Sequence, residues 1–516
     1  MYNYNLSLKF EEIVIANADK CALKFPSGKN LTYKEYNSLA NKFARYLIEI
    51  GIKKNDLIWI SSEKNLTNFV AILSCIKTGI IYSIFDDESP KARLKKIYNT
   101  CNPKVILSSK TIKLEILNYF IKKDSIGIDN EENSFKKKIN KYSEKNLIES
   151  KEITGDDPIY VMFTSGSTGF PKGATITNSN LLNFIEWCKI TFEITNHDVA
   201  TNLNPLYFDN SVFDFYSTLF NGATLVPFEK KLLLEPLNLI NLIEKMNCTQ
   251  WFSVPSLIIY FNTMRVFQNN GLSKMKRIIF GGEGFPKEKL RNLYQLYKNR
   301  INFINVYGPT ECTCICSAHT ISDEDFSCID GLPTLGKIAE NFDYIILSDK
   351  RVVSSGQKGE LCLKGPCVGK GYYNDKNQTD LNFIQNPINK SYKDIIYKTG
   401  DIVWEDPTNN YVNFYSRKDN QIKHMGYRIE LGEIETAANS LKYVIECVAS
   451  HLNKKNISYI YLSIATNIKV TELKIKADLR KKIPEYMVPS KIIFYDYLPK
   501  NSNGKIDKIK INKLLN

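Results

Sequence analysis

Apolar residues in the first part of the chain occur in short runs that alternate with longer mixed stretches. Residues 57–61, 80–85 and 105–108 are compact apolar runs with the length of buried strands. Residues 66–78 lie between the first two runs and have the length and apolar content of a buried helix. Strands that alternate with helices in this way are typical of an α/β fold with largely parallel sheets.

The helix starts are marked by short polar side chains. Thr32 is followed three residues later by Glu35, which is the pattern of a capping box and predicts a helix up to about residue 50. Residues 178–191 predict an amphipathic helix with Asn178 as its cap, and residues 237–245 predict another. These helices continue the α/β pattern beyond the first part of the chain.

Later strands end at turn residues. Residues 223–228, 251–254 and 277–280 predict strands, the last two of which stop at Pro255 and Gly281. Open α/β sheets bind ligands at the carboxyl ends of their strands. Side chains at these strand ends are therefore candidates for a binding site.

The stretch from about residue 110 to 157 has a different composition, rich in Lys, Glu, Asn and Ser. We expect residues 112–120 to be partly helical. The remainder predicts a solvated connector, because it has no sustained apolar period.

Bulk properties limit the class of protein. A chain of 516 residues is too long for one ordinary core, so several domains or subdomains are expected. Its 43% hydrophobic content excludes wholesale disorder. The formal charge of +14 is spread along the chain without a repeated basic block, so we expect no nucleic-acid partner.

The cysteines and the N-terminus indicate a cytoplasmic protein with free thiols. The twelve cysteines form no disulfide-like framework, and the chain begins without a basic and then apolar leader. Cys312, Cys314 and Cys316 alternate at period two, which favours a strand over a zinc site. The most apolar window, residues 69–85, is interrupted by Lys77 and is too short to span a bilayer, so no membrane insertion is expected.

A glycine- and hydroxyl-rich stretch is the first candidate for chemistry. Residues 163–173 read Phe-Thr-Ser-Gly-Ser-Thr-Gly-Phe-Pro-Lys-Gly and follow a strand-like run. Glycines let backbone N–H groups approach an anion, while hydroxyls and a lysine add donors and charge. The spacing differs from that of a P-loop. The stretch predicts polyphosphate binding, and a plain surface loop is the alternative.

Four further motifs follow in order. Residues 305–311, Asn-Val-Tyr-Gly-Pro-Thr-Glu, put an aromatic ring that can stack on a base beside a carboxylate that can hold Mg²⁺. Residues 397–401, Tyr-Lys-Thr-Gly-Asp, end in a carboxylate suited to ribose hydroxyls. The last two are residues 416–435, which contain Gly-Tyr-Arg-Ile-Glu-Leu-Gly-Glu, and residues 499–505, which end in Gly-Lys. Each motif taken alone is more often an ordinary turn or surface loop.

In this order the motifs resemble the adenylate-forming superfamily, which includes acyl-CoA synthetases, luciferases and the adenylation domains of nonribosomal peptide synthetases. The resemblance covers residues 31–505. It is greatest to the amino-acid-activating branch, including stand-alone adenylation domains and D-alanine–D-alanyl carrier protein ligases. The reason is Tyr-Phe-Asp-Asn-Ser-Val-Phe at 207–213. In that branch the aspartate, here Asp209, pairs with the substrate α-ammonium, as a desolvated carboxylate is suited to do.

The resemblance implies an α/β fold with two domains. Residues 1–418 would form a large N-terminal domain of α/β subdomains with mostly parallel sheets and a distorted β-barrel part. Residues 419–516 would form a small, mobile α+β C-terminal domain that carries Lys505. Rotation of this domain about a hinge at Asp419 would let one site serve two half-reactions.

The resemblance also assigns site residues by position. Catalytic roles fall to Lys505, Thr310 and Glu311, and Glu311 would bind Mg²⁺. The residues assigned to ATP are Thr164, Ser165, Gly166, Thr168, Lys172, Asn305, Tyr307, Asp401 and Arg417. The substrate pocket would consist of Asp209, Asn210, Phe213, Phe252, Ile279, Gly281, Val306, Cys314 and Ile315.

This pocket is mostly apolar and similar to those that take branched aliphatic residues such as Val, Ile or Leu. Gly281 is expected to leave room for a branch, whereas Asn210 is suited to a small polar group. A single methylene changes such selectivity by only about 1–3 kcal/mol, so these substrates are not separable from sequence. Small residues such as D-alanine stay open, and any one of these side chains can instead be ordinary core.

The implied reaction is activation of an amino acid by ATP to aminoacyl-AMP with release of pyrophosphate. The acyl group would then pass to the phosphopantetheine thiol of a carrier protein, expected to be separate because the chain ends soon after Lys505. The alternatives are a D-alanine–D-alanyl carrier protein ligase and an acyl- or aryl-CoA ligase, against which Asp209 speaks. A non-catalytic protein of the same fold is disfavoured by the joint presence of Lys172, Glu311 and Asp401 with Lys505.

Overall fold

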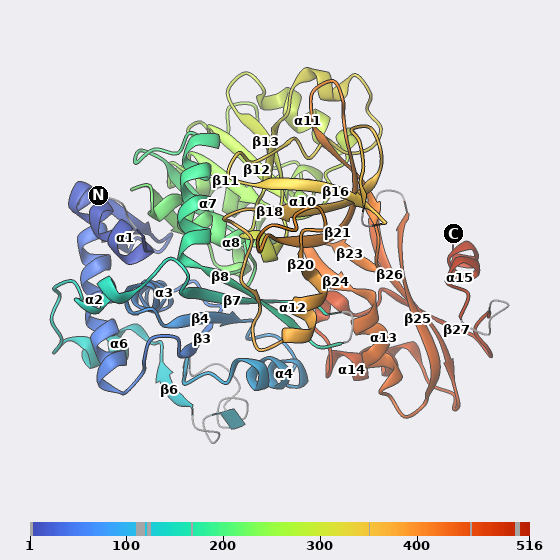
Figure 1. The fold of residues 1–516 in the computed structure, drawn as a ribbon, viewed down its shortest axis with the longest axis horizontal. Helices are drawn as coiled ribbons and strands as arrows, with labels where there is room; N and C mark the ends of the chain where they lie inside the picture. Colours follow the sequence, from blue (N-terminus) through green and yellow to red (C-terminus); the bar gives the residue numbers. More distant parts are fainter. Residues whose placement is uncertain are drawn as a thin grey trace. The chain divides into compact units, whose positions relative to one another are not determined.

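The computed structural model describes residues 4–109, 119–120, 125–166, 169–349, 351–454, 457–500 and 506–515. It forms two compact units (Figure 1). Unit 1 consists of Met1–Phe85, Asn102–Met162 and Gly173–Lys418. Unit 2 consists of Asp86–Cys101, Phe163–Lys172 and Asp419–Asn516, so two short segments from the first half of the chain belong with its C-terminal part.

The largest sheet of unit 1 has nine strands in the order β15-β14-β13-β12-β11-β9-β10-β1-β2. Its central strands, from β13 to β1, pair in parallel. The strands are β1 (Cys21–Lys24), β2 (Asn30–Thr32), β9 (Val199–Asn202), β10 (Thr224–Pro227), β11 (Gln250–Ser253), β12 (Arg277–Gly281), β13 (Asn302–Tyr307), β14 (Ser317–Thr320) and β15 (Lys337–Ile338).

A second sheet has seven strands in the order β19-β8-β7-β4-β3-β5-β6. The four strands β4, β3, β5 and β6 pair in parallel, and β7 pairs in parallel with β4. The strands are β3 (Leu57–Ser61), β4 (Ile81–Phe85), β5 (Val105–Ser108), β6 (Ile126–Asp129), β7 (Pro158–Thr164), β8 (Lys172–Thr177) and β19 (Gly371–Tyr372). The predicted α/β class with mostly parallel sheets is therefore confirmed.

The helices of unit 1 include α1 (Leu6–Asn17), α2 (Tyr33–Glu49), α3 (Leu66–Thr78), α6 (Glu132–Ile139), α7 (Asn178–Thr191), α8 (Asn210–Val212), α9 (Pro236–Lys245), α10 (Pro255–Thr263), α11 (Lys287–Tyr297) and α12 (Lys376–Asn382). The capping box of Thr32 and Glu35 at α2 is confirmed. The cap predicted for α7 is wrong by one residue, because Thr177 caps the helix and exchanges hydrogen bonds with Asn180. Asn178 instead accepts a hydrogen bond from the backbone of Leu6, at 3.0 Å.

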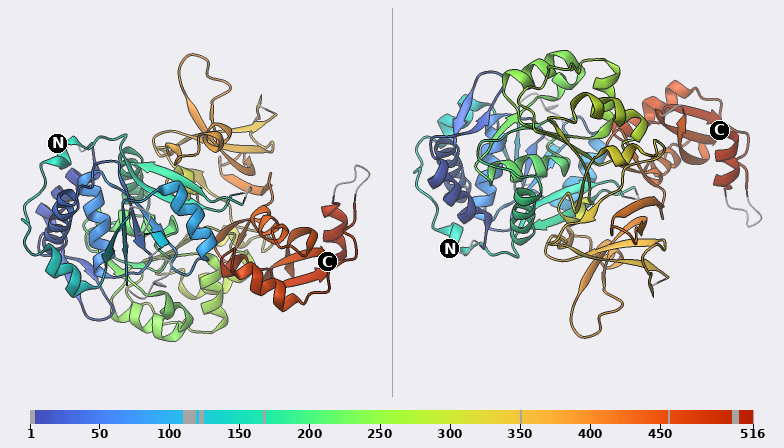
Figure 2. Two further views of the ribbon diagram at one scale, coloured as in Figure 1. Left: turned by 90° about the horizontal axis from the view of Figure 1, so that it is seen from below. Right: turned by 90° about the horizontal axis from the view of Figure 1, so that it is seen from above.

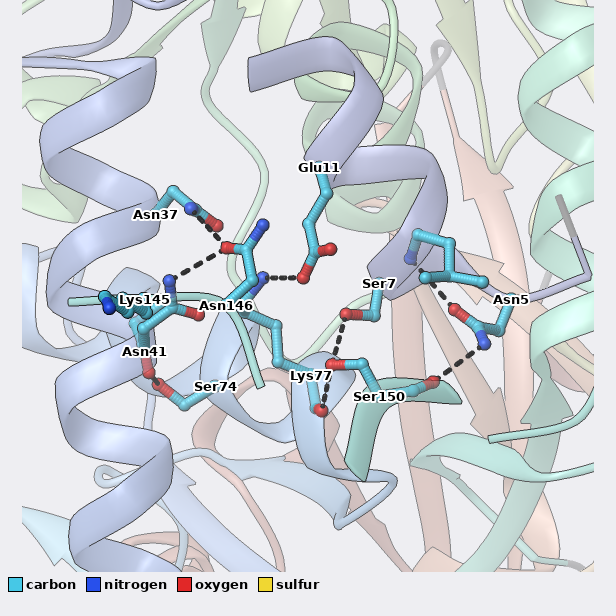
Figure 3. A network of polar contacts seen from close by, with 12 residues as sticks. Asn5, Ser7, Glu11, Asn37, Asn41, Ser74, Lys77, Lys145, Asn146 and Ser150 are labelled. Atoms are coloured by element: carbon cyan, nitrogen blue, oxygen red, sulfur yellow. Dashed lines mark hydrogen bonds and ion pairs between the residues drawn. The ribbon is translucent and has the colours of Figure 1, made fainter. Parts of the chain in front are cut away.

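Most side chains of residues 126–153 are exposed, as predicted for a solvated connector, but the segment also contains β6, α6 and a few buried residues that pack onto the first helices of unit 1. Figure 3 shows Asn146 accepting hydrogen bonds from the amides of Asn37 and Asn41, both on α2. Ser150 bonds to the hydroxyl of Ser7 on α1 and to the carbonyl of Lys77 on α3. These polar side chains satisfy one another between the connector and the helices.

A third sheet of unit 1 is antiparallel. Strands β17-β16-β18-β21-β20 follow one another, and β22 pairs with β21. The strands are β16 (Asp343–Ser348), β17 (Arg351–Val352), β18 (Gly359–Lys364), β20 (Phe383–Gln385), β21 (Ile395–Glu405) and β22 (Val412–Arg417).

Unit 2 has the small α+β architecture that was expected. It contains a hairpin of β23 (Gln421–His424) and β24 (Tyr427–Glu430) and a three-stranded sheet of β25 (Val444–Lys454), β26 (Ile457–Thr466) and β27 (Lys491–Phe494). Its helices are α4 (Lys91–Cys101), α13 (Leu431–Asn439), α14 (Glu472–Arg480) and α15 (Lys508–Leu515). Figure 2 shows the C-terminal elements, coloured dark orange to red, from two further sides.

Candidate active site

The predicted pocket residues of unit 1 gather at the carboxyl ends of three adjacent parallel strands. Phe252 of β11 lies opposite Ile279 of β12, and Gly281 at the end of β12 lies opposite Val306 of β13. Open α/β sheets bind their ligands at this edge. The structure thus brings together residues that are up to 54 positions apart in the chain.

A short helical segment positions the predicted pocket residue Phe213 against Phe252. Helix α8 continues into the π-helical turn η2 (Phe213–Ser217), an uncommon geometry that is often found at functional sites. The turn points Phe213 at Phe252 with ring centroids 5.0 Å apart in an edge-to-face arrangement. Both rings are almost completely buried, so they form a rigid apolar wall.

The position beside Gly281 is occupied by the neighbouring strand. A Cβ at residue 281 would lie 2.4 Å from the carbonyl oxygen of Val306 and 2.7 Å from its Cγ2. Gly281 therefore permits close packing of β12 on β13 and does not leave room for a substrate branch, contrary to our expectation. Asn210 is half-buried above the next glycine, where a Cβ at Gly282 would lie 3.4 Å from its Nδ2.

Asp209 and Thr310 are in direct contact. The hydroxyl of Thr310 donates to Oδ2 of Asp209 at 2.5 Å. Thr310 opens the turn η4 (Thr310–Cys312), and Gly308 just before it allows a close approach, since a Cβ there would lie 2.4 Å from the carbonyl oxygen of Cys314. The residue assigned to the substrate ammonium thus lies beside the residue assigned to the α-phosphate.

The three cysteines of this region do not form the strand that their spacing predicted. Cys312 ends the turn η4, and Cys314 has a left-handed backbone with φ of 74°. Burial and the nearby negative charge of Asp209 raise the pKa of Cys314 well above its usual value, so its thiol stays protonated. Within the described part of the chain no cluster of three or more His, Cys, Asp or Glu side chains is arranged to hold a metal.

Tyr307, Asp401 and Arg417 form a second group. The hydroxyl of Tyr307 donates to Oδ2 of Asp401 at 2.5 Å, while Arg417 donates to Oδ1 at 2.9 Å from the opposite register position of β22. Burial, together with the charge of Asp401, raises the pKa of Tyr307 well above its usual value and keeps the phenol a donor. Asn305 donates to the carbonyl of Thr334 at 2.7 Å.

Glu311 is fully buried, and its Oε1 accepts a hydrogen bond of 2.7 Å from the hydroxyl of Tyr372. Mg²⁺ in nucleotide sites is commonly held by one or two carboxylates together with phosphate oxygens. A single oriented carboxylate fits that use, and a phenol that fixes its rotamer fits the second shell of such a site. Nothing in the sequence around Tyr372 predicted its hydrogen bond to Glu311.

The predicted phosphate loop belongs to unit 2. Its Ser165 hydroxyl donates to the carbonyl of Arg428 at 2.7 Å, and Lys96 of α4 donates to the carbonyl of Gly169 at 2.6 Å. Gly166 closes a tight turn, because a Cβ there would lie 1.9 Å from the carbonyl oxygen of Phe170. In the same unit Thr164 ends β7 and Lys172 begins β8.

Two of the predicted residues, Thr168 and Lys505, lie outside the described residues. Asp419, the predicted hinge, is the first residue of the C-terminal segment of unit 2, and its Oδ1 accepts from the backbone N–H of Gln421 at 3.2 Å. The assignments to hinge, nucleotide and pocket therefore stay predictions, supported by the groupings within each unit.

Comparison with known proteins connects these groupings to a family. The model of the AMP-binding enzyme family matches residues 10–373, and the model of the AMP-binding enzyme C-terminal domain matches residues 433–505. A D-alanine–D-alanyl carrier protein ligase of Bacillus cereus is 29% identical over 515 residues, which cover 98% of each protein.

Bacitracin synthase 1 of Bacillus licheniformis is 30% identical over 503 residues, which cover 97% of this chain but only 9% of that synthase. The chain thus spans a small part of such multidomain relatives. Among solved structures, o-succinylbenzoate CoA synthetase of Bacillus subtilis superposes with a TM-score of 0.85 at 18% identity, over 99% of this chain and 98% of that one. None of the helices in the described ranges is long and apolar enough to cross a membrane.

Proposed function

Because the chain belongs to the AMP-binding enzyme family, a branch of the adenylate-forming superfamily, we propose that it is an ATP-dependent, AMP-forming amino-acid ligase. It converts an amino acid with an aliphatic side chain, similar in size to valine, isoleucine or leucine, to aminoacyl-AMP with release of pyrophosphate. It then transfers the acyl group to the phosphopantetheine thiol of a carrier protein.

The hydrogen bond between Thr310 and Asp209 carries this proposal. A half-buried carboxylate at the mouth of an apolar pocket is suited to an α-ammonium group, which plain fatty or aryl acids lack. The bond ties that carboxylate to a hydroxyl assigned to the α-phosphate. The substrate carboxylate, one carbon from the ammonium, would then lie close to the phosphorus that it attacks.

Each residue assigned to the nucleotide site has a positioning or electrostatic role in this reaction. Tyr307 stacks on adenine and Asp401, oriented by Arg417, accepts from the ribose hydroxyls. Ser165 and Lys172 hold the β- and γ-phosphates. Such groups stabilise phosphoryl-type transfer by orientation and charge rather than by covalent participation.

Glu311 is the residue that would hold Mg²⁺, which neutralises charge on phosphate oxygens when bound. Tyr372 orients the carboxylate of Glu311 through its hydroxyl. Lys505 bridges the substrate carboxylate and the α-phosphate during adenylation. It withdraws when the small C-terminal domain turns about Asp419 for thiol transfer.

A second candidate is the activation of D-alanine for a carrier protein. It is favoured by the relative of that name, which this chain matches over nearly the full length of both proteins. It is also favoured by the packing of Val306 against Gly281, which makes the end of the pocket smaller than the sequence indicated. An acyl- or aryl-CoA ligase is disfavoured because it has no use for Asp209.

The test is exchange of labelled pyrophosphate into ATP with a panel of single acids. The panel contains glycine, L- and D-alanine, valine, leucine, isoleucine, charged amino acids, a fatty acid and an aryl acid. We expect exchange with aliphatic amino acids and none with the plain acids. Exchange with D-alanine alone selects the second candidate, and exchange only with a fatty or aryl acid overturns the proposal.

A further inference from the structure

Asp214 is a completely buried carboxylate that none of the predicted motifs used. It lies on the π-helical turn η2, directly after the pocket residue Phe213. Its Oδ2 accepts hydrogen bonds from the side-chain amides of Asn202 at 3.0 Å and Asn204 at 3.1 Å. The turn that carries Phe213 is therefore fastened to the end of β9 by a carboxylate that accepts two amide donors.

The same network reaches the other phenylalanine of the pocket. Asn204 also donates to the backbone carbonyl of Phe252 at 3.1 Å. One amide side chain thus connects Asp214, the residue after Phe213, to the main chain of β11 at Phe252. The edge-to-face contact of the two rings, with 5.0 Å between centroids, lies next to this bridge.

A lysine completes the network. Lys64, which lies between β3 and α3, donates to the backbone carbonyl of Asn202 at 2.7 Å and attracts Asp214 electrostatically. Burial raises the pKa of Asp214 to about 7, offset in part by its two amide donors and Lys64, and burial lowers the pKa of Lys64 to about 7. The thiol of Cys314 also senses the charge of Asp214.

A buried carboxylate near an ammonium group is an expensive way to hold this turn, since apolar residues of similar volume often give equal or greater stability. Its directional hydrogen bonds do, however, define a unique geometry that interchangeable apolar contacts do not. Here the directional bonds fall on the two elements that carry the pocket phenylalanines. This location favours a role in the shape of the pocket over a role in general stability.

Resting on the amino-acid activation proposed above, we propose that Asp214, Asn204 and Lys64 form a positioning network that determines selectivity for the substrate side chain. The network sets the position of the turn η2 relative to strand β11, and thereby where the rings of Phe213 and Phe252 stand in the proposed pocket. None of the three residues is assigned to ATP or to the α-ammonium group.

The experiment compares Asn204→Leu and Asp214→Asn with the unchanged full-length chain in amino-acid-dependent pyrophosphate exchange. Asn204→Leu removes both amide bonds at similar volume. We expect the ratio of kcat/KM between the best amino acid and its homologue that differs by one methylene to fall about tenfold, the size of effect that one methylene produces in a fitted pocket. The KM for ATP should change less than about twofold, because the nucleotide residues are on other elements.

Asp198→Asn is the matched control. Asp198 is equally buried just before the opposite end of β9, where it pairs with Arg277. Its substitution should lower stability and leave the selectivity ratio unchanged. The same loss of selectivity in this control, or an equal fall of kcat for all amino acids in the network variants, would overturn the inference.

Lys64→Met tests the pH dependence of kcat/KM, which would not change if the network only stabilised the fold. Loss of the ammonium group favours the protonated acid, so the inflection near pH 7 in the pH profile of kcat/KM for the amino acid should move to higher pH. In Asp214→Asn only the titration of Lys64 remains, so the contribution of Asp214 to this inflection should disappear. An unshifted profile in Lys64→Met overturns the role of the pair.

The two proposals fail in different ways. If the unchanged chain shows no exchange with any amino acid, the proposed function fails and the inference falls with it. If the unchanged chain exchanges with an amino acid but the network variants keep its selectivity, only the inference fails.

Discussion

The side chains of Asp209 and Thr310 are 101 residues apart in the chain and joined by a hydrogen bond of 2.5 Å in the structure. One lies at the start of α8 and the other in the turn after β13. The contact couples the group proposed to recognise the amino acid to the group proposed to contact the reacting phosphate. The hydrogen bond therefore fixes the position of Asp209 relative to Thr310.

Asp209→Asn should weaken use of the amino acid while the KM for ATP stays nearly constant. The amide still accepts the hydrogen bond from Thr310 but has no charge for the substrate ammonium. Loss of one charge-assisted hydrogen bond costs about 2 kcal/mol, which is about a 30-fold loss in kcat/KM for the amino acid. Steady-state pyrophosphate exchange measures both constants. An unchanged kcat/KM would remove Asp209 from the substrate site.

Tyr307→Phe should have a small effect on ATP use, and Tyr307→Ala a large one. The phenylalanine loses only the hydrogen bond to Asp401, whereas the alanine also loses the stacking surface, worth about 1–3 kcal/mol for a base on an aromatic ring. The measurement is the KM for ATP in the exchange assay. Equal effects of the two substitutions would mean that the hydroxyl, not the ring, is the important part.

Lys505→Ala should reduce formation of the adenylate by several orders of magnitude, because its charge is proposed to bridge the two reacting groups. Transfer from preformed aminoacyl-adenylate to a carrier thiol should survive, since the lysine is withdrawn in that half-reaction. Lys500→Ala is a nearby control that removes a half-exposed lysine paired with Glu446. Equal loss of both half-reactions in Lys505→Ala would contradict the proposed rotation.

Glu11→Gln should destabilise unit 1 more than Lys77→Met. Lys77 is completely buried on α3 and forms a 2.8 Å ion pair with Glu11 of α1 (Figure 3). Removing only the carboxylate leaves a buried ammonium, which costs about 3–5 kcal/mol, whereas methionine keeps the volume and removes the charge. Urea unfolding of the two variants and of Glu11→Gln/Lys77→Met measures the difference. Nearly equal losses in both single variants would contradict this account.

The stability of unit 2 should fall as the pH drops from about 6.5 to 4. Burial lowers the pKa of His424 to about 4, so in this window the unfolded chain binds a proton that the folded chain does not. For this one residue the free energy of unfolding should be about 2 kcal/mol lower at pH 5 than at neutral pH. His451, which faces His424 from β25, has its pKa lowered by burial in the same direction.

His424→Phe tests this expectation, because it removes the titrating group and keeps a ring. The difference in denaturation midpoint between pH 7.5 and pH 5 should shrink in the variant. His197→Phe, at an exposed histidine, is the control and should leave that difference unchanged. A variant with the full pH dependence would exclude His424 as its source.

Helices, strands and caps were predicted correctly where their physical cause lies within a few residues of the chain. The Thr32–Glu35 capping box and the helix and strand at residues 66–85 follow from side chains within a few positions of one another. The prediction of Asn178 as a cap failed because Thr177, one residue earlier, offers the same chemistry and Asn180 completes its box. The connector is mostly exposed, as predicted, but its contacts with α2 and α3 were not predicted, because polar side chains that look solvated in sequence can satisfy one another between helices.

By itself, the sequence determined the α/β class, the family and the order of the glycine, aromatic and carboxylate motifs. Each single helix, strand or motif behind these conclusions depends on residues close together in the chain. Only the tertiary structure decided that Thr310 bonds to Asp209, that Val306 fills the place beside Gly281, and that Asp214 is fully buried. These are pairings between distant segments brought together by sheet register, and desolvation of a charged group depends on what those segments bury.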